Sequence, residues 1–292
     1  MNIKSATLYI VSTPIGNLGD ISARALDTLR GVETIYAEDT RRTQGLTRHY
    51  GIGARLASLH AHNERYRIDQ VLTRLRDGGD CALVSDAGTP GISDPGAALV
   101  RAVADAGFPV VAIPGASAVL AALAVSGFSS DQFLFLGFAP RKGRGRREWL
   151  NRVAAADVTV VAFESPNRLS ALLSDLAGRG IGEAMACVCR ELTKLHEETR
   201  RGTVSALADY YAGETVRGEV TVVVERTPGL MGGEAAEDLE AARAEAERLV
   251  RAGRSTREIA QEIRAQYGLT RNDAYGLALE AAEPGADEGV DT

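Results

Sequence analysis

Short apolar segments alternate with amphipathic segments over the first 120 residues, and this alternation constrains the fold more than any other feature. The apolar segments are Leu8–Val11, Thr34–Ala37, Cys81–Val84 and Val110–Ile113. Their short length and aliphatic or β-branched composition are typical of buried parallel strands. The amphipathic segments predict helices at Ile21–Leu29, Ile68–Arg76 and Ala97–Ala106. We therefore expect an α/β unit that presents its ligand sites at the carboxyl edge of a parallel sheet.

The rest of the chain divides into a second α/β unit and a helical segment. Further strands are predicted at Phe133–Phe138, Val158–Phe163, Ala184–Cys189 and Val220–Glu225. Alanine, glutamate and arginine dominate from residue 235 to 282, where helices are predicted at Ala241–Arg251, Ile259–Ala265 and Asn272–Ala282. The expected domains are an N-terminal α/β domain over 1–120, a second over 121–228, a helix-turn-helix-like appendage over 235–282 and an acidic tail over 283–292.

Composition narrows the class of protein. The 292 residues carry 33 basic and 39 acidic side chains, a net charge of −6, so any nucleic-acid binding must use a local patch. Three cysteines are too few for a disulfide framework, and the first residues lack the apolar stretch of a secretory signal. Proline and glycine interrupt the uncharged stretch from 107 to 130. We expect a cytoplasmic protein without a membrane segment.

Three loops rich in small residues follow predicted strands and are expected to meet at one sheet edge. They cover residues 13–20, 85–96 and 113–118, and the second is longer than most strand-to-helix connections. None contains lysine or arginine, which disfavours a di- or triphosphate ligand. Neutral loops with a few carboxylates suit a cationic nucleoside such as a sulfonium cofactor.

One dense basic run stands out against the acidic average. Residues 141–152 hold six positive side chains and one negative side chain, Glu148. We interpret this run as a phosphate-contacting surface, which Arg41 and Arg42 would extend. The predicted RNA-binding residues are Arg41, Arg42, Arg141, Lys142, Arg144, Arg146 and Arg147. A solvated helix face is the plainer alternative.

Several motifs together resemble the tetrapyrrole methylase superfamily of S-adenosylmethionine-dependent methyltransferases. They are LYIVSTPIGNLGD at 8–20, AEDTRRT at 37–43, VSDAGTPGISDPG at 84–96, IPGASA at 113–118, FESPNRL at 163–169 and CRELTKLHEE at 189–198. The resemblance spans residues 7–282. Ala61 and Asn167 depart from the family pattern.

The resemblance implies a class III methyltransferase fold, with two α/β domains, a small helical domain and the cofactor in the cleft between the α/β domains. It also implies a homodimer that methylates the ribose 2′-hydroxyl of a cytidine in small-subunit (16S) rRNA, within the 30S subunit. By position, the S-adenosylmethionine site would be formed by Pro14, Ile15, Gly16, Asp86, Ala87, Gly88, Thr89, Ser117, Ala118 and Ser165.

Catalytic roles are assigned to polar residues of the same motifs. Glu191 and Lys194 rank first because they share the end of a predicted strand, and Glu164 is the next candidate. A carboxylate would act as the general base for a weakly acidic hydroxyl, or Lys194 would stabilise the developing alkoxide. No metal is predicted.

Three alternatives remain on the sequence. A nicotinamide-dependent enzyme would need a three-glycine fingerprint with a ribose-binding acid about 20 residues on; Asp39 has that distance, but the glycine spacing is wrong. A sister enzyme acting on a tetrapyrrole or a protein side chain would share the cofactor loops but would not need the basic run. A non-enzymatic nucleic-acid-binding regulator would use the C-terminal helices and leave the three loops without a role.

Overall fold

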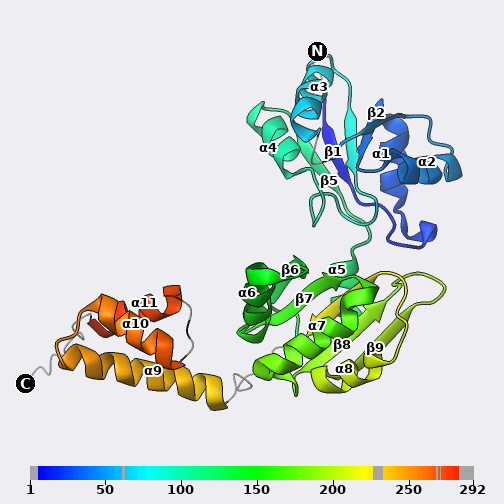
Figure 1. Ribbon diagram of the computed structural model, residues 1–292. Coiled ribbons are helices and arrows are strands. Elements are labelled where there is room, and N and C mark those ends of the chain that lie inside the picture. The colour runs from blue at the N-terminus through cyan, green and yellow to red at the C-terminus, as the bar shows by residue number, and fades with distance from the viewer. Residues whose placement is uncertain (1–5, 61–62, 226–232, 268, 270, 283–292) are drawn as a thin grey trace, which may run out of the picture. The chain divides into compact units, whose positions relative to one another are not determined.

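The computed structural model describes residues 6–60, 63–225, 233–267, 269 and 271–282 (Figure 1). The described residues form two compact units, one ending at residue 225 and one beginning at residue 233. The sequence also predicts a linker over residues 227–233, of which 227–232 lie outside the described residues, as does the expected acidic tail at 283–292.

The first sheet is entirely parallel, with strand order β3-β2-β4-β1-β5. Its strands are β1 (Leu8–Val11), β2 (Thr34–Ala37), β3 (Arg55–Ser58), β4 (Cys81–Val84) and β5 (Val110–Ile113). Its helices are η1 (Leu18–Asp20), α1 (Ala23–Gly31), α2 (Thr40–His49), α3 (Glu64–Arg76) and α4 (Ala97–Asp105). The four strands predicted in this half are confirmed at the predicted residues.

Alternation along the strands sends successive side chains to opposite faces of this sheet. Cys81 and Leu83 of β4 pack with α3 and α4 on one face. Ala82 and Val84 pack with α1 on the other. Because both faces are covered, the strands are apolar throughout their length, which is why they could be predicted.

The second sheet is mixed, with strand order β6-β7-β10-β8-β9. The strands are β6 (Phe133–Phe138), β7 (Thr159–Glu164), β8 (Met185–Arg190), β9 (Glu198–Thr203) and β10 (Val220–Val224). The β6–β7 pair is parallel, and the other three pairs are antiparallel. The helices of this half are α5 (Ala118–Ser126), α6 (Gly143–Ala154), η2 (Pro166–Arg168), α7 (Leu169–Leu176), η3 (Ala177–Ile181) and α8 (Val204–Ala212).

Helix α5 connects the two sheets in sequence and packs on the second one. Val119 and Leu123 of α5 contact Val161, Cys187 and Val223 of the second sheet. The expected boundary at 120/121 therefore falls inside this helix. Ile15 of the first loop joins the same apolar cluster.

The C-terminal unit is a three-helix arrangement with its own core. It comprises α9 (Gly233–Arg251), α10 (Thr256–Tyr267) and α11 (Arg271–Ala282). Ala246, Ile259 and Leu277 bring one buried side chain from each helix into that core. The sequence Ser255-Thr256-Arg257-Glu258 predicts a capping box before α10. The structure confirms it, because the Glu258 N–H donates to Ser255 Oγ and the Ser255 N–H donates to Glu258 Oε2. Among the helices in the described part of the chain, none has the length and apolar character needed to cross a bilayer.

Helix α2 and strands β3 and β9 escaped prediction because their sequences are polar. Helix α2 begins where Asp39 accepts a hydrogen bond from the Arg41 N–H, and it buries only Thr43, Leu46 and Thr47. Strand β9 carries charged residues and is held by its pairing with β8. Strand β3 contains Arg55 and Ser58, buries none of its residues fully and lies at a sheet edge.

In the loop at 85–96 the sequence predicts Asp94 or Ser93 as the cap of the following helix, α4, and this prediction is wrong. Neither Asp94 nor Ser93 caps this helix, whose N-cap is Gly96 with φ 131° and without a side-chain cap. Glu64 accepts the Gly96 N–H instead, and a Cβ at Gly96 would approach Leu83 Cδ2 to 2.7 Å. The close approach to Leu83 and the positive φ together require glycine at this turn.

Candidate active site

The three small-residue loops meet at the carboxyl edge of the first sheet, as predicted. Thr13 and Gly88 exchange two backbone hydrogen bonds, with N···O distances of 2.9 and 3.1 Å. Ser12 Oγ lies 2.9 Å from Thr89 Oγ1. A Cβ at Gly115 would lie 2.9 Å from Ser12 Cβ, so the third loop reaches this contact only because residue 115 is glycine.

A cavity of about 460 Å³ lies between the two α/β halves of the first unit. We call it the interlobe cavity. The predicted cofactor residues that line it are Ile15, Asp86, Ala87, Gly88, Thr89, Ser117, Ala118 and Ser165. Pro14 and Gly16 flank Ile15 in the chain but do not line the cavity themselves. The volume is within the range of about 300–1,000 Å³ that is usual for ligand sites.

Carboxylates from separate segments gather on one wall of the interlobe cavity. They belong to Glu38, Asp86 and Asp94. Desolvation and the neighbouring carboxylates of Asp94 and Asp86 raise the pKa of Glu38. Desolvation also raises the pKa of Asp94, although a hydrogen bond from Ser85 opposes this effect. We call these three carboxylates the acidic wall, and their negative charge favours a cationic ligand.

Asp86 is held in place by groups that follow β2. Its Oδ1 accepts the Asp39 N–H at 2.9 Å, and its Oδ2 lies 3.6 Å from Arg42 Nε. Arg42, predicted to bind RNA, thus lines the interlobe cavity beside a predicted cofactor residue. Arg41 instead pairs with Asp39 at 2.8 Å and is largely exposed.

The rest of the lining includes apolar residues that the sequence did not single out. They include Ile92, Val119, Phe138 and Phe163. The centroids of the Phe138 and Phe163 rings lie 5.4 Å apart, and we call these two side chains the aromatic wall. Phe138 is 57% exposed and Ile92 is 47% exposed, which is unusual for side chains of this size. Ile92 and Phe163 lie in the motifs at 84–96 and 163–169, but an apolar residue in a motif carries no signal that separates ligand contact from core packing.

Glu164 borders the interlobe cavity, but its carboxylate is engaged in ion pairs. Its side chain has 0% exposure, and Oε1 lies 2.5 Å from Arg168 and accepts the Ser165 N–H at 2.7 Å. Oε2 lies 3.9 Å from Arg146 and has no hydrogen-bond partner. This arrangement gives Glu164 a role in holding the end of β7, independent of its predicted catalytic role.

Glu191 and Lys194 form an ion-paired cluster next to the interlobe cavity. Lys194 Nζ lies 2.8 Å from Glu191 Oε1 and 3.1 Å from Oε2 of Glu219, which lines the cavity. The hydrogen bond from Lys194 lowers the pKa of Glu191. Burial alone would lower the pKa of Lys194, but hydrogen bonds to Glu191 and Glu219 outweigh it and raise that pKa. Lys194 therefore stays protonated and Glu191 stays anionic at neutral pH.

Two glycines make room for this cluster. A Cβ at Gly218 would lie 2.3 Å from the Glu191 carboxyl carbon, and one at Gly16 would lie 2.4 Å from Lys194 Cγ. Glu191 itself adopts φ 53°, an uncommon conformation for a residue other than glycine. The Asn17 N–H donates to Thr193 Oγ1 at 3.1 Å, which ties the first loop to this segment.

The predicted RNA-binding run begins immediately after the aromatic wall. Strand β6 ends at Phe138, and Arg141, Lys142, Arg144 and Arg147 follow as exposed side chains. Arg144 pairs with Glu148 at 2.5 Å. Arg146 differs from these residues, because it is 12% exposed and pairs with Asp175 at 2.6 Å. Its guanidinium is therefore used inside the fold.

The chain is similar to a known protein family and to several named relatives. A family model described as Tetrapyrrole (Corrin/Porphyrin) Methylases matches residues 7–208. A relative from Micromonospora olivasterospora named ribosomal RNA small subunit methyltransferase I is 45% identical, over 96% of this chain and 90% of the relative. Relatives of that name from Synechocystis sp. and Mycobacterium tuberculosis are 41% and 40% identical, over 95% and 96% of this chain and 99% and 96% of their own.

Solved structures share the fold at low sequence identity. A cobalt precorrin-4 methyltransferase aligns with a TM-score of 0.60 and 19% identity, over 78% of this chain and 99% of its own. A diphthine synthase aligns with a TM-score of 0.60 and 15% identity, over 78% and 92%. At these identities the likeness concerns the fold alone.

Proposed function

Because the chain belongs to the tetrapyrrole (corrin/porphyrin) methylase family and, within it, to the group named ribosomal RNA small subunit methyltransferase I, we propose that it transfers a methyl group from S-adenosylmethionine to small-subunit ribosomal RNA. The acceptor in this proposal is the ribose 2′-hydroxyl of a cytidine in the decoding region. The observation that carries it is the interlobe cavity, which is lined by the carboxylates of Glu38, Asp86 and Asp94 and by Phe138, three residues before the exposed basic run.

The residues of the interlobe cavity fit a sulfonium nucleoside. Asp86, Glu38 and Asp94 would balance its positive charge, and Phe138 and Phe163 offer apolar surface for its base. The turn that brings Asp86 and Thr89 to the cavity depends on Gly88, which adopts φ +85°. When bound, S-adenosylmethionine supplies an activated methyl group.

The chain's own contribution to the reaction is then alignment and charge stabilisation. Alignment of reacting groups supplies about 7–11 kcal/mol in favourable cases. The protonated Lys194 is suited to stabilising the alkoxide that develops on the ribose, and Glu191 holds it in position. The lowered pKa of Glu191 makes it a weak base, so its predicted role changes here from proton acceptor to positioning residue.

RNA would reach the interlobe cavity across the basic surface of Arg141, Lys142, Arg144 and Arg147. This surface starts three residues beyond Phe138, so phosphates bound there would bring a ribose close to the aromatic wall. The acidic chain as a whole repels RNA, so this local patch must supply the attraction.

The decisive experiment incubates isolated 30S subunits with the full-length protein and labelled S-adenosylmethionine. We expect label in RNA and, after alkaline hydrolysis, in one alkali-resistant dinucleotide that contains cytidine. Asp86→Asn should weaken the binding of S-adenosylmethionine. Lys194→Met should lower kcat and leave the affinity for S-adenosylmethionine nearly unchanged. Label in a protein or a porphyrin instead of RNA would refute the proposal.

The resemblance further implies a cytoplasmic enzyme that works as a homodimer on the assembled 30S subunit. Light scattering of the purified protein tests the dimer, which should show twice the 30.9 kDa chain mass. Parallel assays with naked 16S rRNA and with 30S subunits test the substrate, and we expect label only in the subunits.

A further inference from the structure

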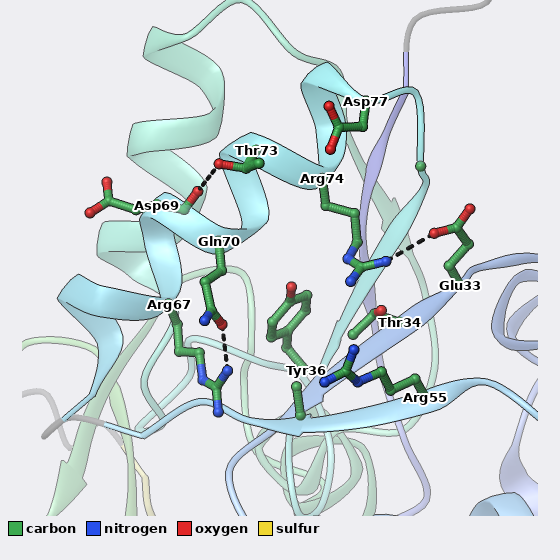
Figure 2. A pocket seen from close by; sticks show the side chains of 12 residues that line it. Glu33, Thr34, Tyr36, Arg55, Arg67, Asp69, Gln70, Thr73, Arg74 and Asp77 are labelled. Carbon is green, nitrogen blue, oxygen red and sulfur yellow. Dashed lines mark hydrogen bonds and ion pairs between the residues drawn. The ribbon is translucent and has the colours of Figure 1, made fainter.

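A second cavity of about 530 Å³ lies between helix α3 and strands β2 and β3 (Figure 2). We call it the α3 cavity. It shares no lining residue with the interlobe cavity. Its chemistry is set by Arg67 and Arg74 from α3, Arg55 from β3, and Thr34 and Tyr36 from β2. In Figure 2 the three guanidinium groups surround the Tyr36 ring.

Two of these arginines have no carboxylate partner among the described residues. Arg67 donates to the neutral groups Gln70 Oε1 at 2.5 Å and Ser58 Oγ at 3.5 Å, and its buried Nε has no partner. No ion pair or side-chain hydrogen bond joins Arg55 to another described residue. A guanidinium without a carboxylate is a ready partner for an anion.

Thr34 provides an independent indication of a ligand. It is 2% exposed and lines the α3 cavity, and its Oγ1 has no hydrogen-bond partner in the described structure. Buried hydroxyls are normally paired, so one that faces a cavity without a partner marks a place for an acceptor or donor from a ligand. Burial raises the pKa of the neighbouring Tyr36, which therefore stays a neutral hydroxyl.

The acidic residues of the α3 cavity do not cancel this positive charge. Glu33 is already paired with Arg74 at 2.9 Å. In Figure 2 the carboxylate of Asp69 points away from Tyr36, and Asp77 lies beyond Arg74. Arg55 and Arg67 thus leave positive charge near a buried, unpaired hydroxyl.

We propose that the α3 cavity binds a phosphoryl group, held by Arg55 and Arg67 with Thr34 as a hydrogen-bond partner. A phosphate offers several charged acceptor oxygens, which match two planar guanidinium groups and a hydroxyl. The phosphoryl group belongs either to a small phosphorylated metabolite or to the backbone of the RNA. The second source rests on the proposed function, and the first does not.

The test is calorimetric titration of the full-length protein with inorganic phosphate and with ribose 5-phosphate in a phosphate-free buffer. We expect Arg55→Gln to weaken binding at least tenfold and Thr34→Val to weaken it several-fold. Arg76→Gln removes an exposed arginine from the same helix that does not line the α3 cavity, and it should leave the affinity unchanged. S-adenosylmethionine affinity reports folding and should be equal in all variants.

A parallel titration with a short RNA separates the two sources. A loss of RNA affinity in Arg55→Gln but not in Arg76→Gln assigns the site to the RNA backbone. A loss confined to the small phosphates assigns it to a metabolite. Equal affinities of Arg55→Gln and Arg76→Gln for every ligand, or no binding by the wild-type protein, would overturn the proposal. Failed methyl transfer with intact phosphate binding would count against the proposed function alone.

Discussion

Glu164 brings a fully buried carboxylate to the wall of the interlobe cavity, balanced by Arg168 and Arg146. Removing one member of a buried ion pair leaves an uncompensated charge, which typically costs about 3–5 kcal/mol. We expect Glu164→Gln to lower the free energy of unfolding by about that amount in urea denaturation. Glu148→Gln, which removes an exposed carboxylate, should change it by less than about 0.5 kcal/mol. Equal stability of the two variants would contradict the buried pair.

The raised pKa of Glu38 predicts opposite pH dependences for stability and cofactor binding. Because Glu38 holds its proton to a higher pH in the folded state, its contribution to stability is lost as pH rises through the raised pKa. The affinity for the cationic cofactor instead falls as pH drops, because the acidic wall is neutralised. The fall should begin above pH 4.5, the ordinary pKa of a glutamate.

Calorimetric titration of S-adenosylmethionine between pH 7 and pH 5 measures this effect. The affinity of Glu38→Gln for S-adenosylmethionine should depend less on pH than that of the wild-type protein. Glu33 lies at the other end of β2, so Glu33→Gln should retain the pH dependence of the wild-type protein. An affinity that rises on acidification would contradict an acidic wall.

At the scale of elements, helix α6 and the turn before it divide their arginines between surface and interior. Replacing Arg141, Lys142, Arg144 and Arg147 by glutamine should weaken RNA binding and flatten its salt dependence. Each lost phosphate contact lowers the slope of log affinity against log salt by about 0.7–0.9. Filter binding at several salt concentrations measures the slope, and Arg24→Gln on α1 should leave it unchanged.

Arg146 on the same helix should respond differently. It donates to Asp175 Oδ2 at 2.8 Å and to the Pro140 carbonyl at 3.0 Å. Arg146→Gln should therefore lower the free energy of unfolding by about 1.5–3 kcal/mol, the usual range for hydrogen bonds to charged groups. A change in salt slope without a loss of stability would place Arg146 on the RNA surface instead.

At the scale of the whole molecule, the C-terminal unit has a core of its own and is separable from the two sheets. Deleting residues 235–292 should leave S-adenosylmethionine affinity within about twofold, because the lining of the interlobe cavity ends at residue 221. We expect methylation of 30S subunits to fall at least tenfold if the appendage docks on RNA. Unchanged methylation would assign it a purely structural role.

Elements that depend only on residues close together in the chain could be predicted from the sequence. The strands of the first sheet are continuous apolar runs bounded by turn residues, and covered parallel strands have that composition in any arrangement. The capping box of Ser255 and Glu258 was predictable because its partners lie three residues apart. The three cofactor loops could be located because glycine and proline mark turns independently of what packs on them.

Only the tertiary structure decided the contacts between residues distant in sequence. Glu38, Asp86 and Asp94 form one wall because parallel strands end at one edge, and burial together with the neighbouring carboxylates then raises the pKa values of Glu38 and Asp94. Arg146 is indistinguishable from its basic neighbours in sequence, yet its guanidinium is largely buried in ion pairs with Glu164 and Asp175. Charge and hydrogen bonding act through space, so the sequence determined which segments form the site, whereas the fold decided which side chains remain free to act in it.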